Sequence, residues 1–374
     1  MRSIWRLFRT IPSRPNVAAA ALWGPRYSML DAWRGLASLG VVIGHLGLDV
    51  GFKLAHACVM VFFVISGYCI SAATESCRRN KIGPSGYMWR RVRRIYPPYF
   101  FAVCLFAATR VVKLREGNGN QLSTSVIAWI QNLTLTQWLS LLAHPTSYAH
   151  QNSTLFVAGF WSLNYEEQFY IVMGLLMVGT IYLKKSMLAG IVFLLIPAFV
   201  WNLRYPSRSY GFFLEYWVAF GLGALVFYRL CKITDTRGRA AVDLGILLLL
   251  LFSLYSNATT HFGQRSVYYE WIVTSSFALV LVCLRSLDGK FKASILGSVL
   301  GGFGLISYSL YLTHQYNFHS SQVVADKLIQ WGLPQKAEFF LRITVMCTVG
   351  AIFWFFCERP FLNKALPNKE SVAN

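Results

Sequence analysis

The sequence predicts an all-α fold: a polytopic membrane helix bundle of about ten transmembrane helices, forming one membrane domain. Hydrophobic residues make up 55% of the 374 residues, and charged residues make up only 13%, well below the share usual in soluble domains. The formal net charge is nevertheless +20, because 35 Lys and Arg outnumber 15 Asp and Glu. An apolar chain with a basic surplus is typical of a multi-pass membrane protein, and it argues against a soluble enzyme or a nucleic-acid-binding protein.

Ten apolar stretches approach the length of about 20 residues that a spanning helix requires. Charged or turn residues separate them. Because ten is an even number, both termini are expected on the same side of the membrane. The predicted spans are 27–48, 54–76, 95–113, 161–183, 186–203, 210–229, 240–257, 267–285, 294–316 and 337–357.

The basic residues fall mainly on one side of these spans. If the N-terminus is inside, 24 of the 35 Lys and Arg lie in inside segments, nine lie outside or at outer span ends, and two lie deep in spans. The positive-inside rule therefore predicts cytoplasmic termini. The expected location is the cytoplasmic (inner) membrane, as a multi-pass protein. The predicted domains are a basic cytoplasmic arm (1–26), a membrane domain (27–362) and a cytoplasmic tail (363–374).

The longest predicted outside loop, about 114–160, contains a semi-apolar stretch at 126–142. Polar residues interrupt this stretch, so it does not read as a regular span. Two interpretations stay open: a lid on the outer face, or an extra membrane segment that would invert the topology after it.

Ionisable residues inside spans are functional candidates, because each costs about 2.5–3.5 kcal/mol on insertion scales. Arg34 and His45 lie eleven residues apart in the first span. At about 100° per residue this spacing puts them on one helix face, about 16 Å apart along the axis. The alternative is a snorkelling arginine and an unrelated histidine near the far boundary.

A basic cluster precedes the third span. Arg90, Arg91, Arg93 and Arg94 stand just before Pro97-Pro98, at the expected start of the helix. Such residues can simply anchor a helix at the inner face, but four guanidinium groups also form a clamp that can bind phosphates bidentately. A phosphate-bearing cytosolic ligand is the sharper prediction.

Acid and base groups stand near the predicted outer ends of other spans. Glu166 lies in the fourth span, and Tyr308, Tyr311 and His314 share a helix face in the ninth. Counted from the span ends, His45, Glu166 and His314 are expected at one level. The predicted path has an anion clamp inside, Arg34 midway, and acid and base groups outside. No metal site is predicted, because the eight cysteines form no C-x-x-C pair.

Six segments together resemble the acyltransferase-3 family of integral membrane O-acyltransferases. They are LDAWRGLASLGVVIGHL with Arg34 and His45, FFVISGY at 62–68, RRVRRIYPPY at 90–99, WSLNYEEQFY at 161–170, ISYSLYLTH at 306–314 and ERP at 358–360. They follow the family's order and cover the chain from about 28 to 362. The chain resembles a stand-alone member without an appended esterase-like domain.

This resemblance implies transfer of an acyl group, typically acetyl, from cytosolic acyl-CoA to a hydroxyl of a cell-envelope or exported saccharide. Acyl-CoA would be a co-substrate rather than a permanently bound cofactor. The expected partners are acyl-CoA, a saccharide or lipid-linked saccharide acceptor, and the lipid bilayer, with no nucleic acid.

In this interpretation His45 is the general base, because an imidazole can take the proton of an attacking alcohol at neutral pH. Glu166 would orient the imidazole, and Arg34 would hold a carbonyl or phosphate of the donor. The four clustered arginines would bind the coenzyme A phosphates. Candidates for acceptor binding or oxyanion stabilisation are Ser66, Tyr68, Tyr308, Tyr311 and His314. Two alternatives stay open: His314 as the base, and Tyr308 or Tyr311 as a transient acceptor of the acyl group. A secondary transporter or flippase for a lipid-linked or anionic sugar is the alternative, although no inverted repeat supports it.

Overall fold

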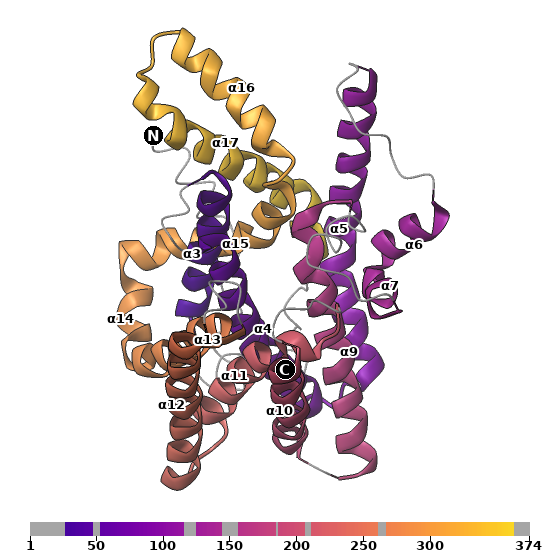
Figure 1. The fold of residues 1–374 in the computed structure, drawn as a ribbon, viewed down its shortest axis with the longest axis vertical. Coiled ribbons are helices and arrows are strands. Elements are labelled where there is room, and N and C mark those ends of the chain that lie inside the picture. The colour runs from indigo at the N-terminus through magenta and orange to yellow at the C-terminus, as the bar shows by residue number, and fades with distance from the viewer. Residues whose placement is uncertain are drawn as a thin grey trace, which may run out of the picture.

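The computed structural model describes residues 27–47, 53–115, 125–143, 156–184, 186–205, 211–260 and 267–362, and within these ranges it contains helices and no strand (Figure 1). The predicted all-α class is therefore confirmed. Seven helical stretches in these ranges are long and apolar enough to cross a membrane, which makes the chain a multi-pass membrane protein. They are α4 (Leu54–Arg79), α10 (Met187–Arg204), α11 (Leu214–Cys231), α12 (Thr236–Thr259), α13 (Val267–Leu284) with its continuation to Ala293, α15 (Ile295–Thr313) and the stretch Gln335–Phe361 around α17 (Glu338–Phe353).

The other three predicted spans are also helical. They correspond to α3 (Met29–His45), α5 (Pro84–Arg115) and α9 (Trp161–Tyr182). These three helices carry most of the ionisable site candidates, and α3 is only 17 residues long. The total of ten spans and the cytoplasmic termini stay predictions, and the segments 1–26 and 363–374 lie outside the described residues.

Helices α3 and α15 pack with their backbones in close contact. A Cβ atom at Gly304 of α15 would overlap the carbonyl oxygen of Asp31 on α3, and one at Gly35 of α3 would overlap the carbonyl oxygen of Leu300. Small residues at a helix interface permit such an approach. This contact brings the helix of Arg34 and His45 against the helix of the predicted tyrosines and His314.

Replacing Gly304 with alanine is expected to destabilise the protein by about 1–3 kcal/mol, because the new methyl group would force α3 and α15 apart. The apparent Tm of the purified protein in detergent would measure this loss. Gly301→Ala on the same helix is the matched control, because a Cβ at Gly301 meets no atom within 4 Å. Equal Tm values for the two variants would contradict the close-packing argument.

Helix α5 begins earlier than predicted. It starts at Pro84 and continues through Pro97 and Pro98, so the arginine cluster lies on the helix and not in a loop before it. A proline removes its own N–H and strains the preceding turn, but packing against neighbouring helices can carry the helix through. The Tyr308 hydroxyl of α15 donates to the Ile95 carbonyl at this turn, over 3.1 Å.

The stretch 126–142 forms two short helices, α6 (Val126–Thr134) and α7 (Gln137–Ala143). At 1.5 Å per residue they extend about 14 and 10 Å, so neither crosses a membrane as a helix of its own. The Tyr96 and Tyr99 hydroxyls of α5 donate to the carbonyls of Thr134 and Asn132. The pair is therefore bound to the side of α5.

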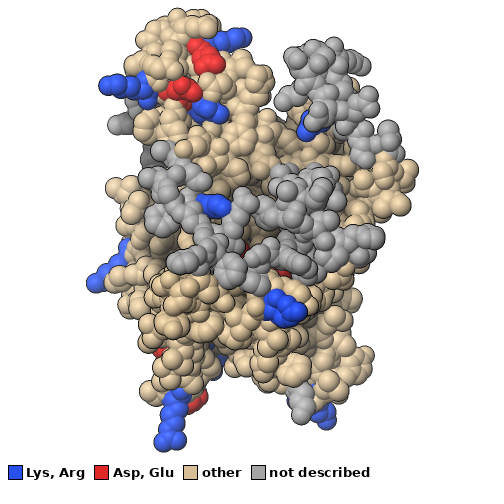
Figure 2. Space-filling model, viewed as in Figure 1, with Lys and Arg blue, Asp and Glu red and all other residues tan. Residues whose placement is uncertain are grey.

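One further helix, α16 (Asn317–Gln330), was not predicted, and it packs against α17 at one end of the molecule (Figure 1). Between α17 and Glu358 the chain forms a π-helical stretch, η5 (Trp354–Glu358). Most of the described surface visible in Figure 2 is uncharged, as expected for a surface in contact with lipid. The remaining short elements are η1 (Ala158–Phe160), η3 (Arg285–Leu287), α14 (Asp288–Ala293), η4 (Gln335–Ala337) and η6 (Arg359–Phe361).

Candidate active site

A cavity lies among α3, α4, α5, α9 and α15. Its apolar lining comes mainly from α4. Its polar lining gathers residues that are far apart in the sequence, as expected of a site assembled by helix packing. The polar and charged residues that line it are Arg34, Ser66, Arg91, Arg94, Ser162, Glu166, Tyr170, Ser307, Tyr308 and Tyr311.

Three guanidinium groups reach this cavity. Arg34 comes from α3, and Arg91 and Arg94 come from α5. The spacing of three residues puts Arg91 and Arg94 on one face of α5, whereas Arg93 is exposed and Arg90 does not line the cavity. The four arginines of the predicted cluster therefore do not act as one group, because Arg91 and Arg94 line the cavity whereas Arg90 and Arg93 do not.

The Arg91 side chain is held by aromatic rings. Its guanidinium carbon lies 5.8 Å from the ring centres of both Tyr87 and Tyr170, within the range of cation–π contacts. Its Nε atom is buried and has no hydrogen-bond partner within the described part of the chain. A fixed guanidinium with unused donors is suited to binding an anionic ligand.

Glu166 lies with the arginines. Its Oε1 atom accepts hydrogen bonds from the Tyr170 hydroxyl (2.6 Å) and the Ser66 hydroxyl (3.3 Å). The expected order by depth, with the arginines at the inner face and Glu166 far above them, is therefore wrong. The reason is that Arg91 and Arg94 lie about 10 and 15 Å along the axis from the start of α5, which raises them into the bundle.

The two predicted histidines lie together. The ring centres of His45 and His314 are 5.1 Å apart, and the ring of Tyr311 lies 5.6 Å from that of His314. His45 is exposed, whereas His314 is 1% exposed. Because Tyr311 also lines the cavity, it connects the arginine-lined cavity with the pair of imidazoles.

Backbone carbonyls hold both imidazoles. Nδ1 of His45 donates to the Val41 carbonyl over 2.8 Å, and Nδ1 of His314 donates to the Tyr311 carbonyl over 2.6 Å. In a neutral imidazole this leaves Nε2 as the basic nitrogen. The backbone thus provides at His45 the orientation that was expected from Glu166.

The tyrosine hydroxyls already have partners. Tyr308 donates to the Ile95 carbonyl, and Tyr311 donates to the Gly159 carbonyl while contacting the Ser162 hydroxyl at 2.6 Å. Tyr68 is buried outside the cavity lining, with its hydroxyl 3.5 Å from the Cys231 sulfur. An oxyanion role for Tyr308 or Tyr311 would require release of the present bond.

Glu358 is a buried carboxylate that the sequence analysis named only as part of the ERP segment and gave no role in the site. It is 4% exposed, and its Oε2 atom accepts a hydrogen bond of 2.5 Å from Ser309. It lies within electrostatic range of Arg94 and Arg34. The sequence does contain a signal for this residue, because Glu358 follows the aromatic run Phe353–Phe356 at the end of an apolar span, where an ionisable side chain is a functional candidate.

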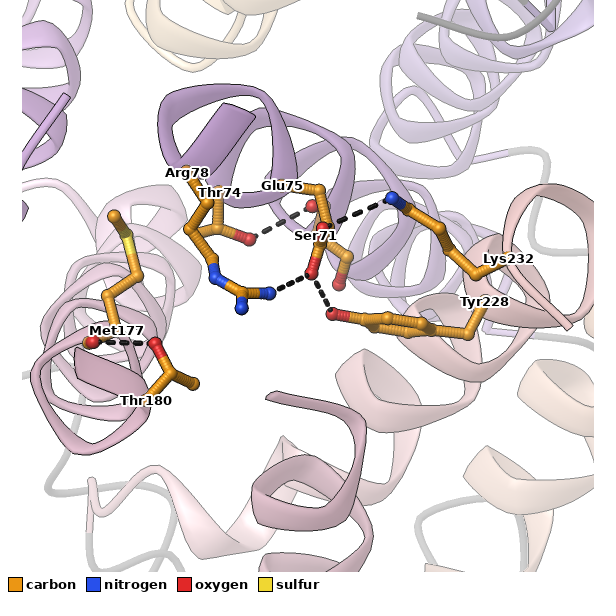
Figure 3. A network of polar contacts seen from close by, with 8 residues as sticks. All are labelled: Ser71, Thr74, Glu75, Arg78, Met177, Thr180, Tyr228 and Lys232. Atoms are coloured by element: carbon orange, nitrogen blue, oxygen red, sulfur yellow. Dashed lines mark hydrogen bonds and ion pairs between the residues drawn. The ribbon is translucent and has the colours of Figure 1, made fainter. Parts of the chain in front are cut away.

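A second buried carboxylate, Glu75, lies near the C-terminal end of α4. It accepts hydrogen bonds from Arg78 (2.7 Å) and the Tyr228 hydroxyl (3.0 Å) and pairs with Lys232 at 3.2 Å (Figure 3). Tyr228 lies on α11 and Lys232 directly follows it. This network joins the ends of α4 and α11.

Replacing Glu75 with alanine is expected to lower stability by about 1–3 kcal/mol, since it leaves the Tyr228 hydroxyl and two cations without their acceptor. The apparent Tm of the detergent-purified variant would measure the effect. Asp326→Ala removes an exposed carboxylate from α16 and serves as the control, with little change expected. A Glu75→Ala protein as stable as the control would show that the network contributes nothing.

The model of the acyltransferase domain family matches residues 27–359. Among similar proteins, "Putative peptidoglycan O-acetyltransferase YrhL" of Bacillus subtilis is 25% identical over 362 residues, covering 88% of this chain and 54% of its own length. "Putative O-acetyltransferase SACOL0978" of Staphylococcus aureus is 26% identical, with 90% and 57% covered. "O-acetyltransferase OatA" of Staphylococcus aureus is 24% identical, with 94% and 60% covered. The chain thus spans little more than half the length of these relatives.

Proposed function

The chain belongs to the acyltransferase domain family and is an acyltransferase of groups other than aminoacyl groups, and from this premise we propose that it moves an acetyl group from acetyl-CoA to a hydroxyl of a cell-envelope saccharide. The observation that carries the proposal is the cavity with three guanidinium groups, connected through Tyr311 to a pair of imidazoles. The guanidinium groups are suited to binding a phosphorylated donor, and the imidazoles are suited to accepting a proton from an alcohol.

Arg34, Arg91 and Arg94 bind the donor phosphates in this proposal, and Arg90 and Arg93 contribute at most from outside the cavity. His45 lies eleven residues beyond Arg34 on α3, about 16 Å along the axis. The long, thin pantetheine arm extends between them and brings the thioester to the imidazole. Glu166 offsets part of the positive charge and holds Ser66 and Tyr170 in the cavity wall.

His45 is the general base. Its Nε2 atom takes the proton of the acceptor hydroxyl as the oxygen attacks the thioester carbonyl carbon. The new C–O bond forms, the C–S bond breaks, and the proton passes from Nε2 to the departing sulfur. The products are the acyl ester and coenzyme A with a free thiol, so the imidazole returns neutral to the next cycle.

Two parts of the proposal rest on the relatives. The similar proteins are named O-acetyltransferases, which favours acetyl as the group transferred, and one name specifies peptidoglycan, which favours an envelope saccharide as the acceptor. The predicted orientation puts the arginine-bearing start of α5 toward the cytosol, where acyl-CoA is made, in the cytoplasmic membrane.

Incubating membranes that contain the protein with acetyl-CoA labelled in the acetyl group tests the function. Label is expected in the saccharide fraction, as an ester released by mild alkali, and only when the protein is present. A transporter or flippase would leave the saccharide unlabelled. Absence of alkali-labile label with active, inserted protein would refute the proposed transfer.

A further inference from the structure

The Glu75 network forms a basic site at the end of α4 and α11. One buried carboxylate, 8% exposed at its side chain, pairs with two cations, so the cluster of Glu75, Arg78 and Lys232 carries a net charge of +1. The side chains of Arg78 and Lys232 are 39% and 33% exposed. The carboxylate is therefore enclosed, whereas the cationic groups it holds are open to a ligand.

Among the described residues, Glu75 is the partner that Arg78 and Lys232 share, and most hydrogen-bond donors of these two cations remain available there. A guanidinium carries five N–H donors and an ammonium carries three. Glu75 engages Arg78 through Nη1 and Lys232 through Nζ (Figure 3). An anionic ligand can therefore bind without breaking either pair, and Glu75 reduces the conformational entropy that Arg78 and Lys232 would otherwise lose on binding.

A second observation points to a ligand beside this network. The Ser71 side chain is fully buried one turn before Glu75 on α4, and its hydroxyl has no hydrogen-bond partner in the described part of the chain. Buried polar atoms normally have partners. Along the axis of α4, Ser71 stands between Ile70, which lines the arginine cavity, and Glu75 of the network.

The network is also close to the arginines of α5. Arg90 and Arg91 lie within electrostatic range of Cys77, the residue before Arg78. Arg91 lines the cavity, whereas Arg78 and Lys232 do not. The cavity arginines thus form one basic site, and Arg78 and Lys232 form a second one nearer the ends of α4 and α11. Both of these helix ends belong to segments predicted to face the cytosol.

We propose that Arg78 and Lys232, held in place by Glu75, bind a phosphate monoester on the ribose of the acyl donor, separately from the diphosphate bound by the cavity arginines. This inference rests on the proposed function, since it assumes a coenzyme A donor. A phosphate monoester carries close to two negative charges at neutral pH and three acceptor oxygens, which suits a site with net positive charge and many donors. The donor class is therefore a 3′-phosphorylated nucleotide thioester.

Dephospho-coenzyme A, which lacks only this phosphate, provides the test. Equilibrium binding of coenzyme A and dephospho-coenzyme A would be measured with the purified full chain in detergent. The wild type is expected to bind coenzyme A roughly 10-fold more tightly, the scale of one or two charge-assisted hydrogen bonds at a partly exposed site. In Arg78→Gln the ratio of the two dissociation constants should fall close to 1, because coenzyme A binds more weakly while the affinity for dephospho-coenzyme A is unchanged.

Lys232→Gln provides an independent second variant and should also reduce the preference. Arg237→Gln removes the same charge from an exposed position at the start of α12 and should keep the wild-type preference. Equal binding of both ligands by the wild type would overturn the inference. An unchanged preference for coenzyme A in both Arg78→Gln and Lys232→Gln would also overturn it. So would an equal loss of affinity for both ligands, because that result indicates a purely structural role. Binding of neither ligand by the wild type would instead overturn the coenzyme A donor of the proposed function.

Discussion

Replacing His45 with alanine is expected to reduce acyl transfer by roughly 10²- to 10⁴-fold, the contribution of a positioned general base. The imidazole is exposed, and its Nδ1 donates to the Val41 carbonyl, which leaves Nε2 as the atom that takes the hydroxyl proton. Without this atom the alcohol must attack with its proton still bound. The initial rate of acetyl transfer from labelled acetyl-CoA, at saturating donor, would measure the loss.

The comparison requires folded protein. His45→Ala should show the size-exclusion profile and apparent Tm of the wild type, because His45 ends α3 and its side chain is exposed. His319→Ala is the matched control, since it removes an exposed imidazole from α16 and should leave the rate unchanged. Wild-type turnover by His45→Ala would exclude this residue as the base.

Replacing Arg94 with alanine is expected to weaken coenzyme A binding by roughly 10- to 100-fold, because a hydrogen bond to a charged group contributes about 1.5–3 kcal/mol. Arg94 lines the cavity with Arg34 and Arg91, so its guanidinium is placed to contact the donor phosphates. The Kd of coenzyme A for the purified variant would measure the change. The KM of the saccharide acceptor should change much less.

Arg93→Ala is the matched comparison, since it removes the same charge from the neighbouring position on α5. Arg93 is exposed and does not line the cavity, so its loss should weaken binding only slightly. Sequence reasoning treated the two arginines alike. A larger effect for Arg93 than for Arg94 would show that the donor binds outside the cavity.

Much of the fold was predictable, because membrane spans depend on local hydrophobicity. All ten predicted spans coincide with helices of the structure, including the polar α3, α5 and α9. The misses also have local causes. The start of α5 was missed because Pro97 and Pro98 were interpreted as the beginning of a helix, and α16 was missed because its sequence is amphipathic and not apolar.

The site was predictable only in part. The shared face of Arg34 and His45 follows from helical periodicity, and in the structure both side chains face α15, Arg34 across the cavity and His45 against His314. The place of Glu166 could not be predicted in this way. It depends on how far α9 is shifted along α5, and such a shift is set by packing between helices.

The sequence by itself determined the all-α membrane class, the family and the set of ionisable residues, because each depends on composition, local periodicity or short motifs. Tertiary structure decided which of these residues meet. It placed Glu166 among the arginines, His45 beside His314, Glu75 in ion pairs with Arg78 and Lys232, and the buried Glu358 within electrostatic range of Arg34 and Arg94. The physical reason is that the helical repeat fixes the direction of a side chain around its own helix. Contacts between helices depend instead on how far the helices are shifted along one another and how closely they approach. In this protein, packing such as that at Gly304 sets that approach.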